Sequence, residues 1–360
     1  MKSTKLVCWC VAAAVVCLFL LADGVHHAEA RPHRERDTEE YSMFVFGDSF
    51  VDAGNRPRTS EKTVLSRAWF YPYGMSDSSH RNRATGRVSD GLVQSDILAK
   101  ILGQDESPPP SRVRRSNPSG VNFAVGGSGV FDSAEAPSLR QQVDQFKSLL
   151  DNGIIEHGDL QRSVALVAVS TGRDYFQRIN QETGSGDMRA LSGQVTDEIV
   201  DSVTRIKGLG VGKVLVNLLP PLGCLPWQSI ASNYDHCDDQ GNMLAGMHNS
   251  ALRGKLESSP QDVYMLDLYT IFADIVQSNS ASVSRLQDTH APCCANQQDP
   301  INGYCGQDDG NGREQYSLCG NPDSFFFWDY IHPTQAGWEA VMERLEGSIE
   351  EFLGIQSSWS

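Results

Sequence analysis

Residues 43–55 read MFVFGDSFVDAGN, and this stretch decides how the fold begins. Its first four residues, 43–46, are all apolar, with no polar alternation. Such a run is typical of a strand that is covered on both faces of a parallel sheet. Gly47, Asp48 and Ser49 follow at once, so the strand is expected to end in a tight turn that exposes the Ser49 hydroxyl above the sheet. Because Gly-Asp-Ser turns also occur in ordinary loops, this turn alone does not indicate an activity.

Similar apolar runs recur along the chain and alternate with helical patterns. Further strands are expected at 121–124, 164–169, 213–219 and 263–268. Apolar residues three or four apart predict amphipathic helices over 90–102, 139–150, 188–209, 243–256 and 335–353. This alternation predicts a single-domain α/β fold with a doubly wound parallel sheet. In such sheets ligands bind outside the carboxyl ends of the strands, so the reactive residues are expected there.

Composition narrows the classes of function. Of the 360 residues, 40% are hydrophobic and 21% charged, which supplies a core and excludes disorder over most of the chain. The 30 Lys and Arg residues against 45 Asp and Glu residues give a formal charge of −15. Because phosphate contacts need a basic surface, no nucleic-acid partner is expected.

The N-terminus has the pattern of a secretory signal peptide. Lys2 and Lys5 precede an almost wholly apolar run over 6–22, and Ala28-Glu29-Ala30 forms a small-x-small cleavage site. A membrane anchor is the alternative, because the apolar run approaches the length of a bilayer span. The short basic start and the cleavage site favour removal. We therefore expect a signal peptide over 1–30, a flexible segment over 31–41 and one domain over 42–356, without stable membrane insertion.

Cysteine usage agrees with secretion. Beyond residue 30 the cysteines are Cys224, Cys237, Cys293, Cys294, Cys305 and Cys319. An even number in an oxidising compartment predicts disulfides. A local Cys224–Cys237 loop is the simplest pairing, and Cys293 and Cys294 are expected to bond separately to Cys305 and Cys319. A zinc site built from His290 with Cys293 or Cys294 is the alternative, against which the secreted context argues.

Two more motifs stand where chemistry is expected. Gly126-Gly127-Ser128-Gly129 follows the second strand, and glycine N–H groups there can approach a ligand closely, as in an oxyanion hole; a flexible turn is the alternative. Near the C-terminus stands Asp329-Tyr-Ile-His332-Pro333. One turn can bring Asp329 to His332, so that the carboxylate orients an imidazole general base. A surface histidine at the start of the last helix is the alternative there.

Together these motifs resemble the GDSL lipase/esterase family of SGNH hydrolases, and in particular its plant secreted branch. The matching stretches are 44–55, 122–127 and 327–333, with further matches at Tyr73-Gly74, 85–91 and 219–226. The resemblance covers about residues 42–353 and implies a three-layer α/β/α domain with a five-stranded, parallel, flavodoxin-like sheet. No Gly-x-Ser-x-Gly elbow occurs, which argues against the ordinary α/β-hydrolase fold.

The resemblance also implies a role for each matching residue. Ser49 would be the nucleophile, His332 the general base and then acid, and Asp329 the residue that orients His332. The backbone N–H groups of Ser49 and Gly127 would hold the oxyanion.

Arg173 departs from the family pattern. The family carries Gly-Asn-Asp after its third strand, where the Asn side chain is a third oxyanion donor, but this chain reads Gly172-Arg173-Asp174. Losing one such donor typically lowers turnover by ~10²–10³. A guanidinium donates charged hydrogen bonds, so Arg173 can either replace the Asn, bind an anionic substrate or disable the site.

The expected function is a secreted serine esterase or lipase that hydrolyses carboxylic esters through an acyl-enzyme, in the apoplast or cell wall. One alternative is an acyltransferase that uses the same triad to esterify an alcohol acceptor. Another is a binding or defence protein whose catalysis is impaired by Arg173. The expected partner is a small-molecule or polymer-linked ester, and no cofactor or metal is implied. The ester itself and the oligomeric state are left open by the sequence.

Overall fold

The computed structural model describes residues 41–113, 117–179, 185–257, 262–277, 285–296, 299 and 303–355. The chain divides into two compact units, Met1–Asp37 and Thr38–Ser360, and every described element lies in the second. The expected signal peptide over 1–30, and all of the expected segment 31–41 except its last residue, lie outside the described residues. Within the described ranges, no helix combines the length and apolar character needed to cross a membrane.

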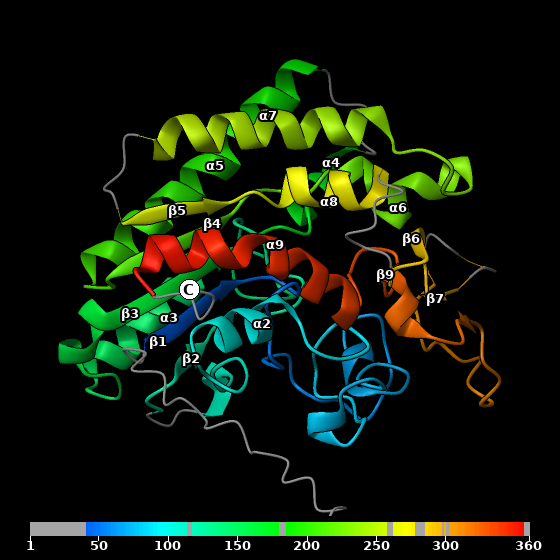
Figure 1. Cartoon of the computed structure of the whole chain (residues 1–360), viewed down its shortest axis with the longest axis horizontal. Coiled ribbons are helices and arrows are strands. Elements are labelled where there is room, and N and C mark those ends of the chain that lie inside the picture. The colour runs from blue at the N-terminus through cyan, green and yellow to red at the C-terminus, as the bar shows by residue number, and fades with distance from the viewer. Residues whose placement is uncertain are drawn as a thin grey trace, which may run out of the picture. The chain divides into compact units, whose positions relative to one another are not determined.

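A five-stranded sheet organises the described fold (Figure 1). Its strands are β1 (Ser42–Gly47), β2 (Gly120–Asn122), β3 (Ser163–Ala168), β4 (Lys213–Asn217) and β5 (Val263–Leu266). They lie in the order β2-β1-β3-β4-β5, and every neighbouring pair is parallel. This is the flavodoxin-like order. The sequence prediction of fold class, sheet and strand positions is confirmed.

Helices cover both faces of this sheet (Figure 1). α5 (Ser185–Gly208) contacts both α3 (Leu139–Asp151) and α7 (Asp239–Leu256). α9 (Gln335–Leu353) contacts both α2 (Gln94–Ile101) and α8 (Leu268–Gln277). The shorter helical segments are α4 (Arg173–Ile179), α6 (Pro226–Ser229), η1 (Arg67–Trp69), η2 (Ser78–His80), η3 (Ser111–Val113), η4 (His157–Arg162), η5 (Leu222–Cys224), η6 (Ile230–Ser232) and η8 (Pro322–Ser324).

Some boundaries differ from the sequence prediction. The strand expected over 263–268 ends at Leu266, because α8 follows from Leu268 and the residue before it, Asp267, accepts a hydrogen bond from Thr270 N in its first turn at 3.2 Å. The helix expected from residue 90 starts only at Gln94, where Asp96 accepts from Val93 N at 2.8 Å. The predictions contained neither α8 nor α4. α8 has a polar stripe of only three residues, Thr270, Asp274 and Gln277, and its first residue lies inside the run expected as a strand; α4 is short.

Phenylalanines on β1 fix how α3 lies on the sheet. Phe46 stacks on Phe123, with ring centroids 5.2 Å apart, and meets the edge of Phe146 on α3 at 5.6 Å. Phe44 also contacts Phe146, at 4.8 Å. All four rings are buried, and burying each contributes roughly 1.5–3 kcal/mol. The stretch that opens the fold therefore also anchors its first helical layer.

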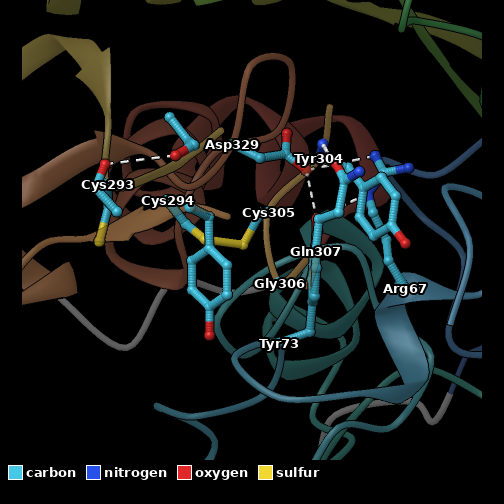
Figure 2. The surroundings of a disulfide bond; sticks show 12 residues. Arg67, Tyr73, Cys293, Cys294, Tyr304, Cys305, Gly306, Gln307 and Asp329 are labelled. Atoms are coloured by element: carbon cyan, nitrogen blue, oxygen red, sulfur yellow. Dashed lines mark hydrogen bonds and ion pairs between the residues drawn. A yellow bond between two sulfur atoms is a disulfide. The ribbon is translucent and has the colours of Figure 1, made fainter. Parts of the chain in front are cut away.

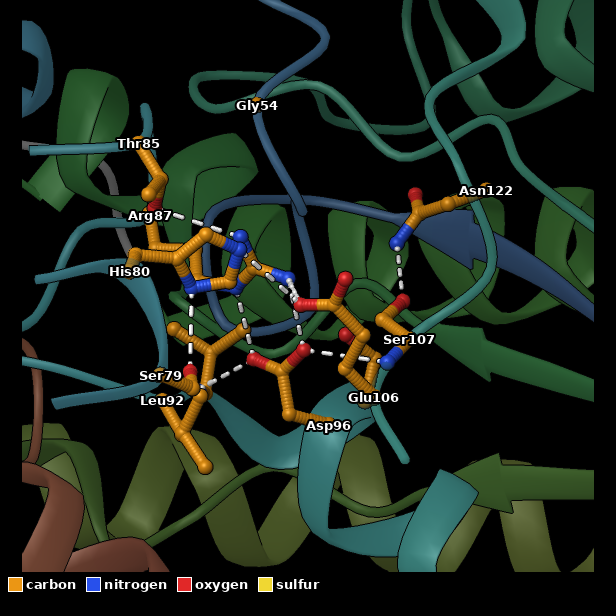
Figure 3. Close-up of polar contacts among 12 residues, drawn as sticks. Gly54, Ser79, His80, Thr85, Arg87, Leu92, Asp96, Glu106, Ser107 and Asn122 are labelled. Atoms are coloured by element: carbon orange, nitrogen blue, oxygen red, sulfur yellow. Dashed lines mark hydrogen bonds and ion pairs between the residues drawn. The ribbon is translucent and has the colours of Figure 1, made fainter. Parts of the chain in front are cut away.

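The matched stretch 85–91 has a structural role. Arg87 donates from Nε and Nη2 to the two carboxylate oxygens of Asp96, both at 2.8 Å (Figure 3). Asp96 lies at the start of α2 and also accepts from Ser107 N at 3.0 Å. Two-point Arg–carboxylate pairs are geometrically specific. Arg87 and Asp96 thus fasten two loops around the first turn of α2.

Two small sheets and three disulfides form the C-terminal part of the described fold. β6 (Asp288–Pro292) runs parallel to β9 (Phe325–Phe327), and β7 (Cys294–Ala295) runs antiparallel to β8 (Ser317–Leu318). The disulfides are Cys224–Cys237, Cys293–Cys319 and Cys294–Cys305. The local Cys224–Cys237 loop and the separate partners of the adjacent cysteines agree with the sequence prediction. Both sulfurs of the zinc alternative are therefore held in disulfides.

Candidate active site

The turn that carries Ser49 is shaped by the glycine before it. Gly47 ends β1 with φ +146°, and a Cβ there would lie 2.0 Å from Ala168 O on β3. Only glycine allows the strand to turn this close to its neighbour. Asp48 N then donates to Ala168 O at 3.0 Å, and Gln142 of α3 bonds both Gly47 N and Gly47 O. Ser49 consequently leaves the sheet at a fixed angle.

Two aspartates on either side of Ser49 connect its turn to the neighbouring loops. Asp48 is buried, and its Oδ2 accepts from Ser170 N at 2.6 Å and Thr171 N at 2.8 Å, in the loop after β3. Asp52 is also buried, and its Oδ2 accepts from Gly126 N at 2.7 Å, in the loop after β2. Burial raises the pKa of both carboxyls, while these N–H donors lower it. The loops after β1, β2 and β3 are thereby held in fixed positions relative to one another.

His332 reaches the site on a closed turn between β9 and α9. Trp328 N donates to His332 O at 2.7 Å, which closes the turn. Inside it, Asp329 Oδ1 accepts from Ile331 N at 3.0 Å and from His332 N at 2.9 Å. These bonds direct the carboxylate toward the imidazole of the same turn. The Asp-x-x-His spacing therefore holds the pair through contacts within residues 329–332.

A continuous hydrogen-bonded chain joins the two ends of the sequence. Ser49 Oγ lies 2.7 Å from His332 Nε2, and His332 Nδ1 lies 2.7 Å from Asp329 Oδ1. The exposed fractions are 7% for Ser49, 3% for His332 and 4% for Asp329. Phe50 packs edge-on against the imidazole, at 5.8 Å between centroids. The structure thus brings the three residues singled out in the sequence into one serine–imidazole–carboxylate arrangement.

The second oxygen of Asp329 has its own partners (Figure 2). Tyr73 Oη donates to Asp329 Oδ2 at 3.0 Å, and Arg67 Nη2 lies 3.5 Å from the same oxygen. Arg67 Nε also donates to Tyr73 Oη at 2.8 Å. Tyr73 packs in one cluster with Cys294 and Cys305, whose disulfide lies nearby. Tyr73 was matched only as part of a motif, and Arg67 carried no signal in the sequence.

These contacts settle the charge of Asp329. Burial alone would raise the pKa of this carboxyl, but the charge of His332, their hydrogen bond and the charge of Arg67 hold the pKa well below its usual range. An ionised carboxylate at this place fixes the imidazole tautomer and stabilises an imidazolium beside Ser49.

Ser49 and Gly127 both leave their backbone N–H groups available. Within the described residues, neither N–H donates a hydrogen bond. Gly127 has φ +86°, and a Cβ there would lie 2.9 Å from Arg56 Nη2. Buried N–H groups without partners are rare in proteins, and next to a nucleophile they suit an oxyanion.

Arg173 begins α4 and lines the same cavity as Ser49 and His332. Its Nη2 forms an ion pair with Glu135 Oε2 at 2.6 Å. Its Nη1 faces Gly127, since a Cβ on that glycine would lie 3.8 Å away. Arg173, at the family's Asn position, therefore lines the cavity and forms an ion pair with Glu135.

The cavity above Ser49 measures about 380 Å³. Its large apolar lining residues are Val64, Leu65, Trp69, Val88, Phe176 and Ile331. Val64 and Leu65 are 48% and 39% exposed, which is high for large apolar side chains. Its charged lining residues include Arg56, Arg173 and Glu135. The site can therefore accept a molecule with an apolar part.

Residues 43–345 match the family model of the GDSL-like lipases and acylhydrolases, from the first residue of the opening stretch to α9. The chain belongs to this family. The resemblance noted in the sequence is thus confirmed over most of the described fold.

Proteins of Arabidopsis thaliana named as GDSL esterases/lipases are similar over most of their length. GDSL esterase/lipase At5g03610 is 35% identical, with 86% of this chain and 87% of that protein covered. GDSL esterase/lipase At2g36325 is 34% identical, with 96% and 98% covered. Among solved structures, LAE5, an alpha/beta hydrolase enzyme from the metagenome of Lake Arreo, Spain, is 11% identical, covers 88% of this chain and 97% of its own, and has a TM-score of 0.37. This last likeness is too weak to support an argument.

Proposed function

We propose that this protein hydrolyses carboxylic esters with Ser49 as nucleophile, His332 as general base and acid, and Asp329 as the residue that orients His332. Membership of the GDSL-like lipase/acylhydrolase family and its esterase-named relatives support the ester hydrolase activity. The observation that carries the residue roles is the chain of two 2.7 Å contacts from Ser49 through His332 to Asp329.

The reaction follows from these contacts. Ser49 Oγ attacks the ester carbonyl while its proton passes to His332 Nε2, and the resulting imidazolium is stabilised by Asp329. The proton then moves to the departing alcohol oxygen as the carbonyl–oxygen bond breaks, which leaves an acyl group on Ser49. Water, deprotonated by His332, attacks this acyl group, and the proton returns to Ser49 Oγ as the acid leaves.

The oxyanion is assigned to the N–H groups of Ser49 and Gly127, which have no acceptor among the described residues. Arg173 takes the place of the third donor in this proposal. Its charged guanidinium faces Gly127 and offers several N–H groups, so it is a functional replacement for the Asn amide.

Secretion belongs to the same proposal. The three disulfides indicate an oxidising compartment. We take residues 1–30 as a cleaved signal peptide and residues 42–356 as the secreted hydrolase domain, acting in the apoplast or cell wall. Sequencing the N-terminus of protein collected from the medium should find it near Arg31; an intact Met1 would contradict cleavage.

The activity can be tested by trapping the nucleophile. A fluorophosphonate should label the folded wild-type protein, and Ser49→Ala should abolish labelling and lower p-nitrophenyl ester turnover by about 10³-fold or more. Ser148→Ala, on the exposed side of α3, is the matched control and should retain both. Folded wild-type protein that neither reacts with the probe nor hydrolyses any ester would contradict the proposal.

A further inference from the structure

Arg56 presents an uncompensated charge to the cavity. Its Nε and Nη2 donate to the carbonyl of Gly126, at 3.1 and 2.5 Å, and its Nη1 donates to the carbonyl of Glu135 at 3.2 Å. Within the described residues no carboxylate oxygen lies within ion-pair distance of Arg56. By contrast, Arg67 forms an ion pair with Asp329, and Arg173 forms one with Glu135. Arg56 thus differs from the other two arginines of the cavity, because its hydrogen bonds go to neutral backbone carbonyls.

The surroundings of Arg56 favour an added anion. Burial lowers the pKa of its guanidinium, and the charges of Asp52 and Glu135 only partly offset this. Asp52 is itself occupied by the N–H groups of Gly54, Asn55 and Gly126. A half-buried guanidinium that has no carboxylate in direct contact is stabilised when a carboxylate reaches it.

Arg56 and Arg173 converge on the same point. A Cβ on Gly127 would lie 2.9 Å from Arg56 Nη2 and 3.8 Å from Arg173 Nη1. The two guanidinium groups therefore flank the residue whose N–H faces the reacting carbonyl. Since the large remaining side chains of the lining are mostly apolar, a ligand that contacts both kinds of residue combines an apolar part with a negative charge.

We infer that the preferred substrate is an ester that carries a free carboxylate, which binds Arg56 and Nη2 of Arg173, while Nη1 of Arg173 stays with the oxyanion and the apolar part lies against Val64, Leu65 and Trp69. This inference rests on the proposed function. The protein as a whole is strongly acidic, with a formal charge of −15, so its general field opposes an anionic ester. The preference must therefore come from these two side chains.

Pairs of esters that have similar shapes, and of which one carries a carboxylate and the other a neutral group, test the inference. The p-nitrophenyl monoester of adipic acid is compared with p-nitrophenyl 6-methylheptanoate, in which an isopropyl group replaces the carboxylate. A second pair, the butanoates of 4-hydroxyphenylacetic acid and 4-isobutylphenol, places the charge on the alcohol side, and a methylene group in both keeps the two phenols similar as leaving groups. In at least one pair, kcat/KM of the wild-type protein should be higher for the carboxylate ester. The pair that shows this identifies the side that carries the charge.

Variants assign the preference to the arginines. Arg56→Gln should lower the ratio of the two kcat/KM values about tenfold, and Arg56→Lys should retain part of it. Glu135→Gln should raise the ratio about threefold, because it removes the carboxylate that competes for Arg173. Arg140→Gln is the control for Arg56→Gln. It also removes one positive charge, but on the exposed face of α3, and should leave the ratio unchanged.

The outcomes separate this inference from the proposed function. Ser49-dependent hydrolysis with equal ratios in the wild-type, Arg56→Gln and Glu135→Gln proteins would overturn the inference and leave the esterase standing. Absence of all hydrolysis would instead contradict the proposed function. In that case, equilibrium binding of the same ester pairs to folded Ser49→Ala protein, with and without Arg56→Gln, decides the inference: equal affinity for charged and neutral esters would overturn it.

Discussion

Residues far apart in the sequence give the Ser49–His332–Asp329 chain its geometry. Asp48 and Asp52 flank the serine, and each binds N–H groups of a different loop, so the serine turn is connected to the loops after β2 and β3. Asp329 is held on both oxygens, by its own turn on Oδ1 and by Tyr73 and Arg67 on Oδ2. Residues outside the proposed triad thus hold Ser49, His332 and Asp329 in place.

At this scale Arg67 is predicted to set the acidic limb of the pH–rate profile. Arg67→Gln removes a positive charge 3.5 Å from Asp329 Oδ2, so the carboxylate acts more fully on His332 and favours the protonated ring, which cannot act as base. The pH at which kcat/KM falls to half should therefore rise by about half to one unit. Arg67→Lys keeps the charge and should restore the wild-type profile. A loss of rate without a shift in pH would assign Arg67 to packing alone.

Among the elements, the junction between β9 and α9 leaves no room for a side chain at one position. A Cβ on Gly337, in the first turn of α9, would lie 2.4 Å from Phe326 O, whereas one on Gly347 in the same helix would meet nothing within 4 Å. The close approach places β9 directly beside the start of the helix. Asp329 and His332 lie in the turn between them.

Two alanine substitutions in α9 should therefore act in opposite directions. Gly337→Ala should lower the free energy of unfolding by about 1–3 kcal/mol, because backbone must move to admit the methyl group. Gly347→Ala should raise it by about 1 kcal/mol, since alanine favours helix and the methyl has open space. Urea unfolding of both variants measures this, and equal effects of the same sign would show that the junction is not crowded.

In the molecule as a whole, a buried histidine outside the active site links stability to pH. His248 on α7 lies 2.7 Å, through Nδ1, from Tyr175 Oη on α4, and burial lowers the pKa of His248 to about 3. In the unfolded chain its pKa returns to about 6.5. Between these values the unfolded state binds more protons than the folded state, so this group destabilises the fold as pH falls.

The free energy of unfolding should consequently fall between pH 6.5 and pH 4, with His248 contributing up to about 1.4 kcal/mol per pH unit. His248→Gln should flatten this part of the curve, whatever its effect at neutral pH. His236→Gln, at an exposed position, is the matched control and should leave the slope unchanged. An unaltered slope in His248→Gln would show that His248 protonates equally well in the folded state.

Most of the fold could be predicted because its signals are local. The five strands of the main sheet are short apolar runs, and the longer helices carry regular apolar stripes, so periodicity alone located them. α8 and α4 are short helices, and the first residue of α8 lies inside the run expected as a strand, so neither pattern stood out. The Asp329–His332 pair was also predictable, because its bonding lies within a single turn.

The sequence by itself determined the sheet and the family, and it singled out the three side chains that we propose as the triad, since each signal lies in contiguous residues or in a fixed spacing. Only the tertiary structure decided what surrounds them. Tyr73 meets Asp329 across 256 positions, and Arg56 lies beside Gly127 through loops of different strands. Such contacts depend on how loops leave the carboxyl ends of neighbouring strands and on the direction of each side chain, and neither is encoded in a local pattern.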